Sequence, residues 1–145
     1  MKSLAIFAIL LSLAGCAIRQ EVEPAARVAG GEICLIDNPD VGGRFLEVYR
    51  RELEKKGYQT RVMPATATLY DCPQVSRYTA NWRWDVAYYL AFADIAIYED
   101  GKRVGHVVYD SLQGSMNFAK FVNGENKIVE LVNQLFPGPA QAATQ

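Results

Sequence analysis

The segment from Tyr78 to Asp110 limits the possible folds most, because nearly all of it has the composition and periodicity of β-strands. Trp82, Trp84 and Val86 alternate with polar residues, which is typical of a strand with one face in water. The following "LAFADIAIY" is apolar on both faces and indicates a central strand. The sequence EDGK at residues 99–102 predicts a hairpin turn, after which "RVGHVVYD" returns antiparallel.

The preceding segment has the pattern of a strand, a helix and a second strand. "EICLI" at residues 32–36 is a short apolar run between turn-forming residues, which predicts a buried strand. A helix is predicted from Asp40, a candidate cap, to about Lys56, and Gly57 is a suitable stop. Its apolar face has helical spacing: Val41, Phe45, Val48, Tyr49 and Leu53. "YQTRVM" at residues 58–63 alternates, so the three elements are predicted to form a parallel, right-handed βαβ unit.

A second helical pattern runs from Asn117 to Phe136, with a break near Asn123-Gly124. The predicted order is β-α-β-β-β-α. The predicted fold class is α/β (α+β), a two-layer sandwich in which a mixed sheet carries two helices on one face. We place this single domain at residues 32–136. Residues 137–145 contain two prolines and no large apolar residue, and are predicted to be a disordered tail.

The N-terminus has the pattern of an export signal. Lys2 precedes an apolar run from Leu4 to Leu13 that only Ser12 interrupts. The run is too short to span a bilayer, which needs roughly 20 apolar residues. It ends in Leu13-Ala14-Gly15-Cys16, a sequence that resembles the bacterial lipobox.

The lipobox resemblance implies that residues 1–15 are a signal peptide and that Cys16 carries a diacylglycerol and an acylated amine, for example a palmitate. Two or three chains would anchor the protein stably to a membrane. Ala17 rather than Asp follows the cysteine, which favours the outer membrane, facing the periplasm. Residues 16–31 are then predicted to be the lipidated N-terminus and a tether. The alternative is an ordinary signal with a chance cysteine.

Cysteine parity bears on Cys34 and Cys72. If Cys16 is acylated, only these two remain, and an oxidising periplasm favours a disulfide between them. Closing a loop of roughly 40 residues would stabilise the fold by about 4 kcal/mol in the chain-entropy description. The alternative is two buried thiols that pack as small hydrophobic groups.

Composition and spacing argue against several functional classes. The chain has 15 basic and 16 acidic residues and no basic stripe, so nucleic-acid binding is not expected. His106 is the only histidine, and we expect no metal and no other cofactor. His106 and Asp110 would lie about 13 Å apart on one strand, too far for a catalytic triad. Asp94 interrupts an apolar strand, where an ion pair with Arg83 is favoured over catalysis. We therefore predict no enzymatic activity.

Aromatic residues are dense around the two tryptophans. We predict a ligand or partner patch made of Trp82, Trp84 and Tyr88, with Arg83 as a polar companion on the opposite side of the strand. The alternative is that these aromatic side chains pack in the core against the helices.

Two stretches carry a resemblance over the whole domain. "YTANWRWD" from Tyr78 and "KIVELVNQLF" from Lys127, together with the lipobox, are similar to the Sbal-type family of small Gram-negative envelope lipoproteins. The resemblance implies no particular activity. A looser analogy of fold links such lipoproteins to accessory subunits of envelope transport and secretion machines. We expect a membrane-anchored, non-catalytic protein that binds an envelope protein partner. The alternative is a periplasmic domain that binds or senses a peptide or glycan.

Overall fold

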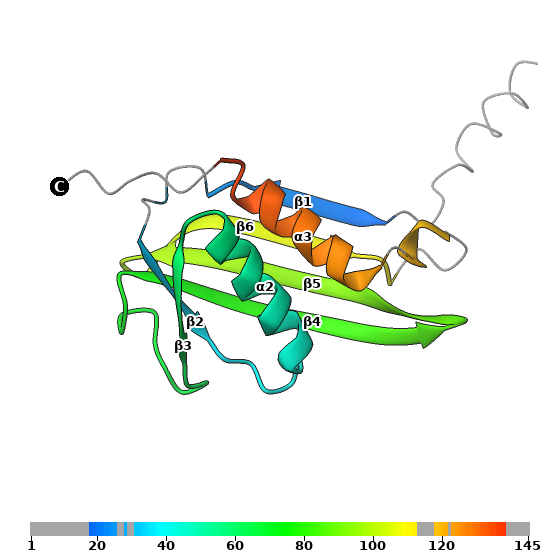
Figure 1. Ribbon diagram of the computed structural model, residues 1–145, viewed down its shortest axis with the longest axis horizontal. Coiled ribbons are helices and arrows are strands. Elements are labelled where there is room, and N and C mark those ends of the chain that lie inside the picture. The colour runs from blue at the N-terminus through cyan, green and yellow to red at the C-terminus, as the bar shows by residue number, and fades with distance from the viewer. Residues whose placement is uncertain (1–17, 26–27, 29–30, 113–117, 122, 139–145) are drawn as a thin grey trace, which may run out of the picture.

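A six-stranded mixed sheet carries two helices on one of its faces (Figure 1). A computed structural model of the protein describes residues 18–25, 28, 31–112, 118–121 and 123–138. Along the chain the elements are β1 (Arg19–Glu23), β2 (Glu32–Ile36), α2 (Gly43–Lys55), β3 (Gln59–Met63), β4 (Gln74–Asp85), β5 (Ala87–Glu99), β6 (Lys102–Asp110), η2 (Phe118–Phe121) and α3 (Gly124–Leu135). Across the sheet the strands lie in the order β1-β6-β5-β4-β2-β3.

This architecture confirms the predicted fold class of a two-layer sandwich. β2, α2 and β3 form the predicted parallel βαβ unit, although α2 begins at Gly43 rather than at Asp40. The predicted hairpin joins β5 and β6, and its turn places Asp100 and Gly101 at φ angles of 49° and 78°, as a primed two-residue turn requires. The order along the chain contains two strands more than predicted. One is β1, which has no clear signal in the sequence. The other is a strand that the predicted order left out of its count, since the alternating tryptophans that indicate a strand form the end of β4.

The predicted tether at residues 16–31 is in part a piece of the domain. β1 pairs antiparallel with β6 and places Arg19 opposite Asp110. Ala25 is buried, and its N–H donates to the carbonyl of Leu135 at 2.7 Å. The prediction failed because "RQEVE" has no apolar run of its own. It is an edge strand whose partner is distant in sequence, so local periodicity carries little signal.

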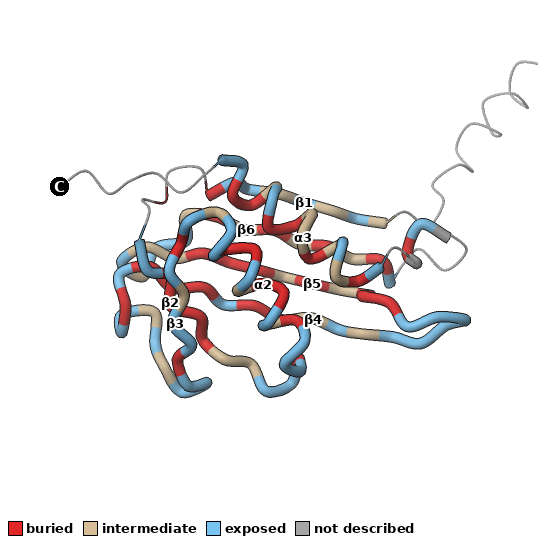
Figure 2. The backbone as a smooth tube through the Cα atoms, in the orientation of Figure 1, coloured by how far each residue is buried: buried red, intermediate tan, exposed pale blue. Residues whose placement is uncertain are grey.

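The main core lies between the sheet and the two helices. In Figure 2 the buried parts of α2, α3 and the central strands face one another. Every layer contributes fully buried side chains, among them Phe45, Tyr49, Ile95, Tyr109 and Leu131. The hydroxyl of Tyr49 on α2 lies 2.8 Å from that of Ser76 on β4, so the core retains one satisfied polar pair. Burial raises the pKa of Tyr49, which keeps this phenol neutral.

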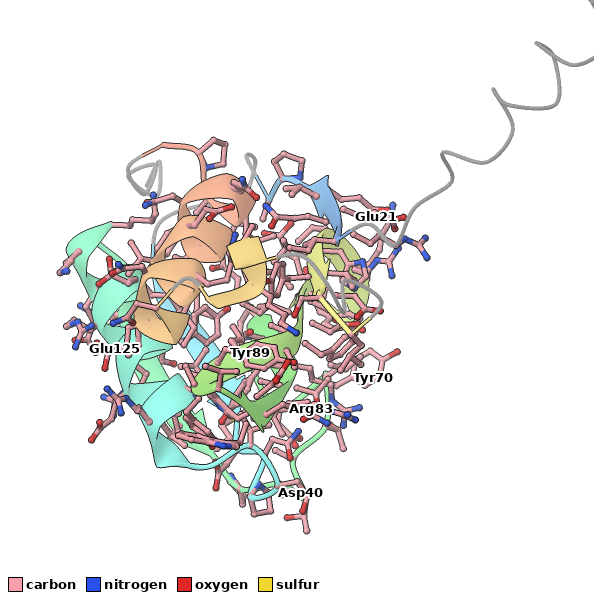
Figure 3. The ribbon with its side chains drawn as sticks, turned by 90° about the vertical axis from the view of Figure 1, so that its right-hand side faces the viewer. Glu21, Asp40, Tyr70, Arg83, Tyr89 and Glu125 are labelled. Carbon is pink, nitrogen blue, oxygen red and sulfur yellow. A yellow bond between two sulfur atoms is a disulfide. The ribbon has the colours of Figure 1, made fainter. Side chains whose placement is uncertain are left out.

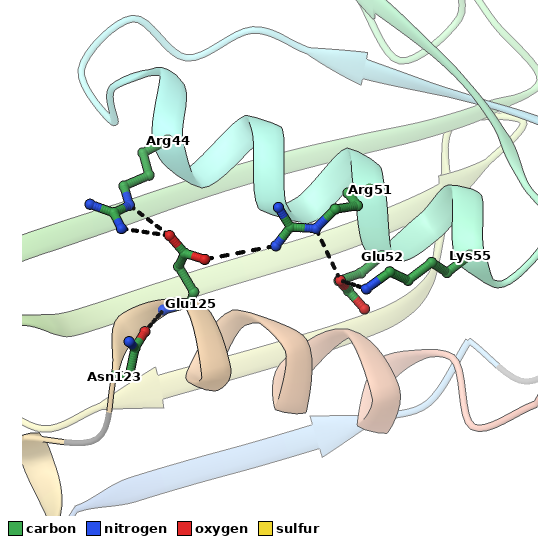
Figure 4. A network of polar contacts seen from close by, with 6 residues as sticks. All are labelled: Arg44, Arg51, Glu52, Lys55, Asn123 and Glu125. Atoms are coloured by element: carbon green, nitrogen blue, oxygen red, sulfur yellow. Dashed lines mark hydrogen bonds and ion pairs between the residues drawn. The ribbon is translucent and has the colours of Figure 1, made fainter.

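An ion-pair network joins α2 to the start of α3 (Figure 4). Glu125 in the first turn of α3 accepts hydrogen bonds from Nε and Nη2 of Arg44, at 2.9 and 2.6 Å. Nη2 of Arg51 lies 3.8 Å from the other carboxylate oxygen. Asn123 caps the helix, because its Oδ1 accepts the N–H of Glu125 at 2.9 Å. The hydrogen bond from Arg44 holds the pKa of Glu125 below its usual value.

The loop of residues 64–73 between β3 and β4 covers part of the face opposite the helices. Cys34 in β2 and Cys72 in this loop form the predicted disulfide, with their Cα atoms 6.3 Å apart. The two cysteines lie in a second, smaller core with Ile36, Met63 and Val75. The disulfide therefore ties the loop to β2, next to the edge strand β3, and leaves the face beside it open to a pocket described below.

Candidate functional site

The β4–β5 hairpin projects beyond the rest of the sheet (Figure 1). β6 pairs with β5 only as far as Phe92, which faces Asp110, whereas β4 and β5 remain paired out to Asp85 and Ala87. From Phe92 to the tip residue, Val86, the chain advances six residue steps, or about 20 Å. Val86 forms the tip at a φ of 60°.

Four large apolar side chains gather at this end, and we call them the hairpin patch: Trp82, Trp84, Val86 and Tyr88. The last three have exposed fractions of 74%, 87% and 62%. Trp82 is half-buried and stacks on Tyr88, with ring centroids 5.5 Å apart and planes 6° from parallel. It also packs over the first residue of α3, Gly124, where a Cβ would lie 2.2 Å from the indole. The patch is thus an exposed aromatic surface that packs against the start of α3 through Trp82.

The structure brings together three of the four residues of the predicted patch. Arg83 lies on the other face of β4, on the side away from the helices in Figure 3. There it faces Tyr89 across the hairpin. On β4 the carboxylate of Asp85 accepts a 2.6 Å hydrogen bond from the buried Nζ of Lys120, which also lies 5.5 Å from the Tyr89 ring. Through Lys120, η2 therefore holds the end of the hairpin in place.

The predicted ion pair between Asp94 and Arg83 is wrong. Asp94 on β5 pairs instead with His106 on β6, with Oδ1 2.9 Å from Nε2. In the strand register Asp94 faces Thr79, whereas Arg83 lies four residues farther along β4, about 13 Å away. A His-Asp pair becomes a nucleophile-activating set only with a hydroxyl or thiol beside the imidazole. In the part of the chain that the structure describes, no such group hydrogen-bonds to His106.

A pocket of about 540 Å³ lies on the sheet face opposite the helices, and we call it the sheet-face pocket. One wall is the loop from Asp37 to Asp40 after β2, and Ala65 after β3 contributes the other. The floor comes from β4 and β5, including Arg77 and Asp94. The two tryptophans do not line it. Two tyrosines, Tyr78 and Tyr98, do line it.

Tyrosines contribute to the rim of this pocket. Tyr78 hydrogen-bonds through its hydroxyl to Oδ1 of Asp37 at 3.4 Å, and Asn38 donates its amide to the Tyr78 carbonyl at 3.0 Å. Burial raises the pKa of Tyr78, so its hydroxyl stays protonated. These contacts fix the loop after β2, which forms one wall of the pocket.

Other predicted features have different outcomes. Cys16 lies outside the described residues, as does most of the predicted tail at residues 137–145. Within the described residues, no helix combines the length and apolar character needed to cross a membrane. Glu32, Cys34 and Cys72 form a group of potential metal ligands, but the disulfide engages both sulfur atoms. This group is therefore not suited to a metal.

The sequence did not identify Val86 or Arg77 as residues of a candidate site. A positive φ usually indicates Gly, Asn or Asp, so the valine between Asp85 and Ala87 gives no turn signal. Arg77 stands in an ordinary alternating strand. Only the loop after β2, which folds beside it, makes it part of a pocket.

Comparison with known proteins gives a likeness of fold alone. No family model matches the sequence, and no curated protein matches it. Among solved structures, the PelC dodecamer from Paraburkholderia phytofirmans is similar over 87% of this chain and 99% of that chain, with a TM-score of 0.53 and 15% identity. A single-residue variant of the same dodecamer covers the same shares, with a TM-score of 0.54 and 16% identity.

Proposed function

We propose that this protein is a lipid-anchored, periplasm-facing accessory protein of the cell envelope, which works by binding and not by catalysis. The hairpin patch carries this proposal. It is an exposed aromatic surface at the end of the molecule where the chain enters the domain. The resemblance to Sbal-type lipoproteins remains a prediction and agrees with the same role.

The position of β1 relates the patch to the proposed anchor. β1 begins at the end of the sheet from which the hairpin projects, because Arg19 faces Asp110, which in turn faces Phe92 (Figure 1). Cys16 is only three residues before Arg19, so their Cα atoms are at most about 11 Å apart. A lipid on Cys16 would therefore hold this end of the domain close to the membrane.

The chemistry of the patch suits a membrane surface. Tryptophan and tyrosine favour the boundary between headgroups and acyl chains, because an apolar ring and a polar tip are then both satisfied. Arg83 on the other face of the same hairpin supplies a positive charge for lipid phosphates. We infer that the hairpin patch is a second membrane contact, which orients the anchored domain.

The backbone conformation of Val86 indicates that the tip of the hairpin has a role beyond folding. A β-branched residue at a φ of 60° is strained by roughly 1–3 kcal/mol, where glycine would not be. Its side chain is 87% exposed, so packing within this chain does not repay that strain. A contact between the Val86 side chain and an apolar surface outside the chain would compensate for that strain.

Fluorescence of the lipidated protein in vesicles tests this contact. Brominated lipids should quench the emission of Trp84 in a Trp82→Phe variant, since Trp84 is the more exposed indole. Val86→Gly should weaken the quenching and leave the stability in urea equal or higher. Tyr70→Ser is the matched control: its ring is 81% exposed but lies against Gly101, at the opposite end of β5. Unchanged quenching in Val86→Gly would refute the contact.

The partner we propose first is another copy of this chain. The similar solved structures are dodecamers, and at 15–16% identity they support a search for self-assembly in this chain. Native mass spectrometry of the lipidated protein should show a species larger than a monomer. In-cell crosslinking then tests for other envelope proteins. A monomer with no crosslinked protein above the background of a Cys16→Ser strain would refute the accessory role.

A further inference from the structure

The sheet-face pocket lies at a point where α/β folds commonly hold ligands. It opens at the carboxyl ends of the parallel strands β2 and β3. From the end of β2 the chain passes into α2 on one face of the sheet. From the end of β3 it passes into the loop of residues 64–73, which the disulfide ties to the other face. A crevice remains where the two connections diverge, as at the switch point of an open α/β sheet.

The size of the pocket is that of a small-molecule site. Its volume of about 540 Å³ falls within the usual range of roughly 300–1,000 Å³. Part of its surface is apolar, from Pro39, Ala96 and Tyr98. The rest is polar, with charged groups of both signs that point to a ligand able to donate and accept hydrogen bonds.

Arg77 and Asp94 are placed to share such a ligand. In the register of β4 and β5, Arg77 faces Ala96 and Thr79 faces Asp94, so the charged pair is diagonal on one face. Their side chains nevertheless do not join. Asp94 is bonded to His106, and within the described ranges no hydrogen bond or ion pair involves the exposed side chain of Arg77. A guanidinium and a carboxylate thus border the same pocket without neutralising each other.

The charged side chains that line the pocket limit the class of ligand that can bind there. Asp37, Asp40 and Asp94 against Arg77 give the lining two more negative than positive side chains, which disfavours phosphates and carboxylates. A cationic ligand would be repelled by the positive charge of Arg77 in the floor of the pocket. A neutral molecule rich in hydroxyl groups satisfies both signs, because each hydroxyl accepts from the guanidinium or donates to a carboxylate. Its C–H faces could lie on the apolar residues.

We propose that the sheet-face pocket binds an uncharged saccharide unit between Arg77 and Asp94. This site is separate from the hairpin patch and does not depend on the proposed membrane contact. Its polar groups come from two neighbouring strands and one hydrogen-bonded loop, so the backbone that carries them is fixed before a ligand arrives.

Saturation-transfer NMR on the full lipidated protein, in a detergent without a sugar headgroup, tests the proposal. The probes are maltose, cellobiose and N,N′-diacetylchitobiose, with digalacturonic acid and a glucosamine dimer as charged counterparts. At least one neutral probe should receive saturation and bind more tightly than both charged ones. Arg77→Met and Asp94→Asn should each weaken it about tenfold, the usual scale for a hydrogen bond to a charged group.

Arg50→Met is the matched control, since Arg50 lies on α2, in the layer on the opposite side of the sheet, and should bind like the wild type. Thermal melting shows whether Arg77→Met, at an exposed position, remains folded; Thr79→Val is the substitute if it does not. Binding to no neutral probe, tighter binding of a charged probe, or equal affinity in Arg77→Met and Arg50→Met would each overturn the proposal. Membrane quenching of the Arg77→Met variant should be normal, so failure here is distinguishable from failure of the hairpin contact.

Discussion

Gly105→Ala tests whether the start of the domain is docked as the structure shows. Gly105 lies in β6 beneath the chain that follows β1. A Cβ on Gly105 would lie 2.4 Å from the Cβ of Ala25, 3.0 Å from its Cα and 3.1 Å from its nitrogen. Because two of these atoms are backbone, no rotamer change relieves the clash. The segment must move, and the 2.7 Å hydrogen bond from Ala25 to the Leu135 carbonyl must lengthen.

Overpacking of this kind costs roughly 1–3 kcal/mol. Replacing glycine by alanine in a strand returns roughly 0.5–1 kcal/mol through the unfolded chain. We therefore expect Gly105→Ala to lower the free energy of unfolding by about 1–2 kcal/mol. Equilibrium urea unfolding measures this change, and faster amide exchange at Ala25 locates it.

Gly43→Ala is the matched control for this substitution. Gly43 is the first residue of α2, and a Cβ there would meet no atom within 4 Å. Alanine should be neutral at this position or stabilise by up to about 1 kcal/mol. If both variants unfold alike, and Ala25 exchanges equally fast in both, the residues after β1 do not dock. They would then be the tether that the sequence predicts.

Two further predictions concern the disulfide and the helix seam. The double variant Cys34→Ala, Cys72→Ala should lose about 4 kcal/mol of unfolding free energy, because the bond closes a loop between residues 38 apart; a urea midpoint equal to that of the wild type would refute this. Glu125→Gln should be less stable than the wild type at pH 7. Arg44 lowers the pKa of Glu125 in the folded protein. The stabilisation from the charged Glu125 is therefore fully present above the pKa that Glu125 has in the unfolded chain, and it is lost as pH falls through the pKa that Glu125 has in the folded protein. Urea unfolding at pH 7 and pH 3 should therefore show the difference shrinking in acid, and a constant difference would contradict it.

Local signals account for what the sequence predicts correctly. The apolar run at residues 32–36, the helical spacing up to Lys55 and the Asp-Gly turn at residue 100 each specify an element within a few residues of chain. The disulfide followed from cysteine parity and an expected compartment. Cys34 and Cys72 meet because the loop after β3 folds back over the sheet. The two-layer fold class follows because the apolar faces of these elements must all pack in one common core.

What the sequence misses depends on pairing between distant segments. β1 is polar and alternating, and only its register with β6 makes it a strand. Asp94 pairs with His106 rather than Arg83 because the strand register sets which side chains are neighbours, and pattern alone does not provide the register. Trp84 and Tyr88 are exposed because β4 and β5 continue past β6, a length difference that periodicity does not reveal.

The two proposed sites are related through a single strand. From Arg77 in the pocket to the end of β4 at Asp85 there are eight residues, or about 26 Å of extended chain. The pocket therefore lies at the base of the hairpin, and the hairpin patch lies at its tip. If the tip rests on the membrane beside the anchored N-terminus, the pocket is held no farther than about this distance from the lipid surface. A ligand bound there would be a glycan or other saccharide within reach of the membrane, and an accessory protein fixed in this orientation would present it to partners on the same surface.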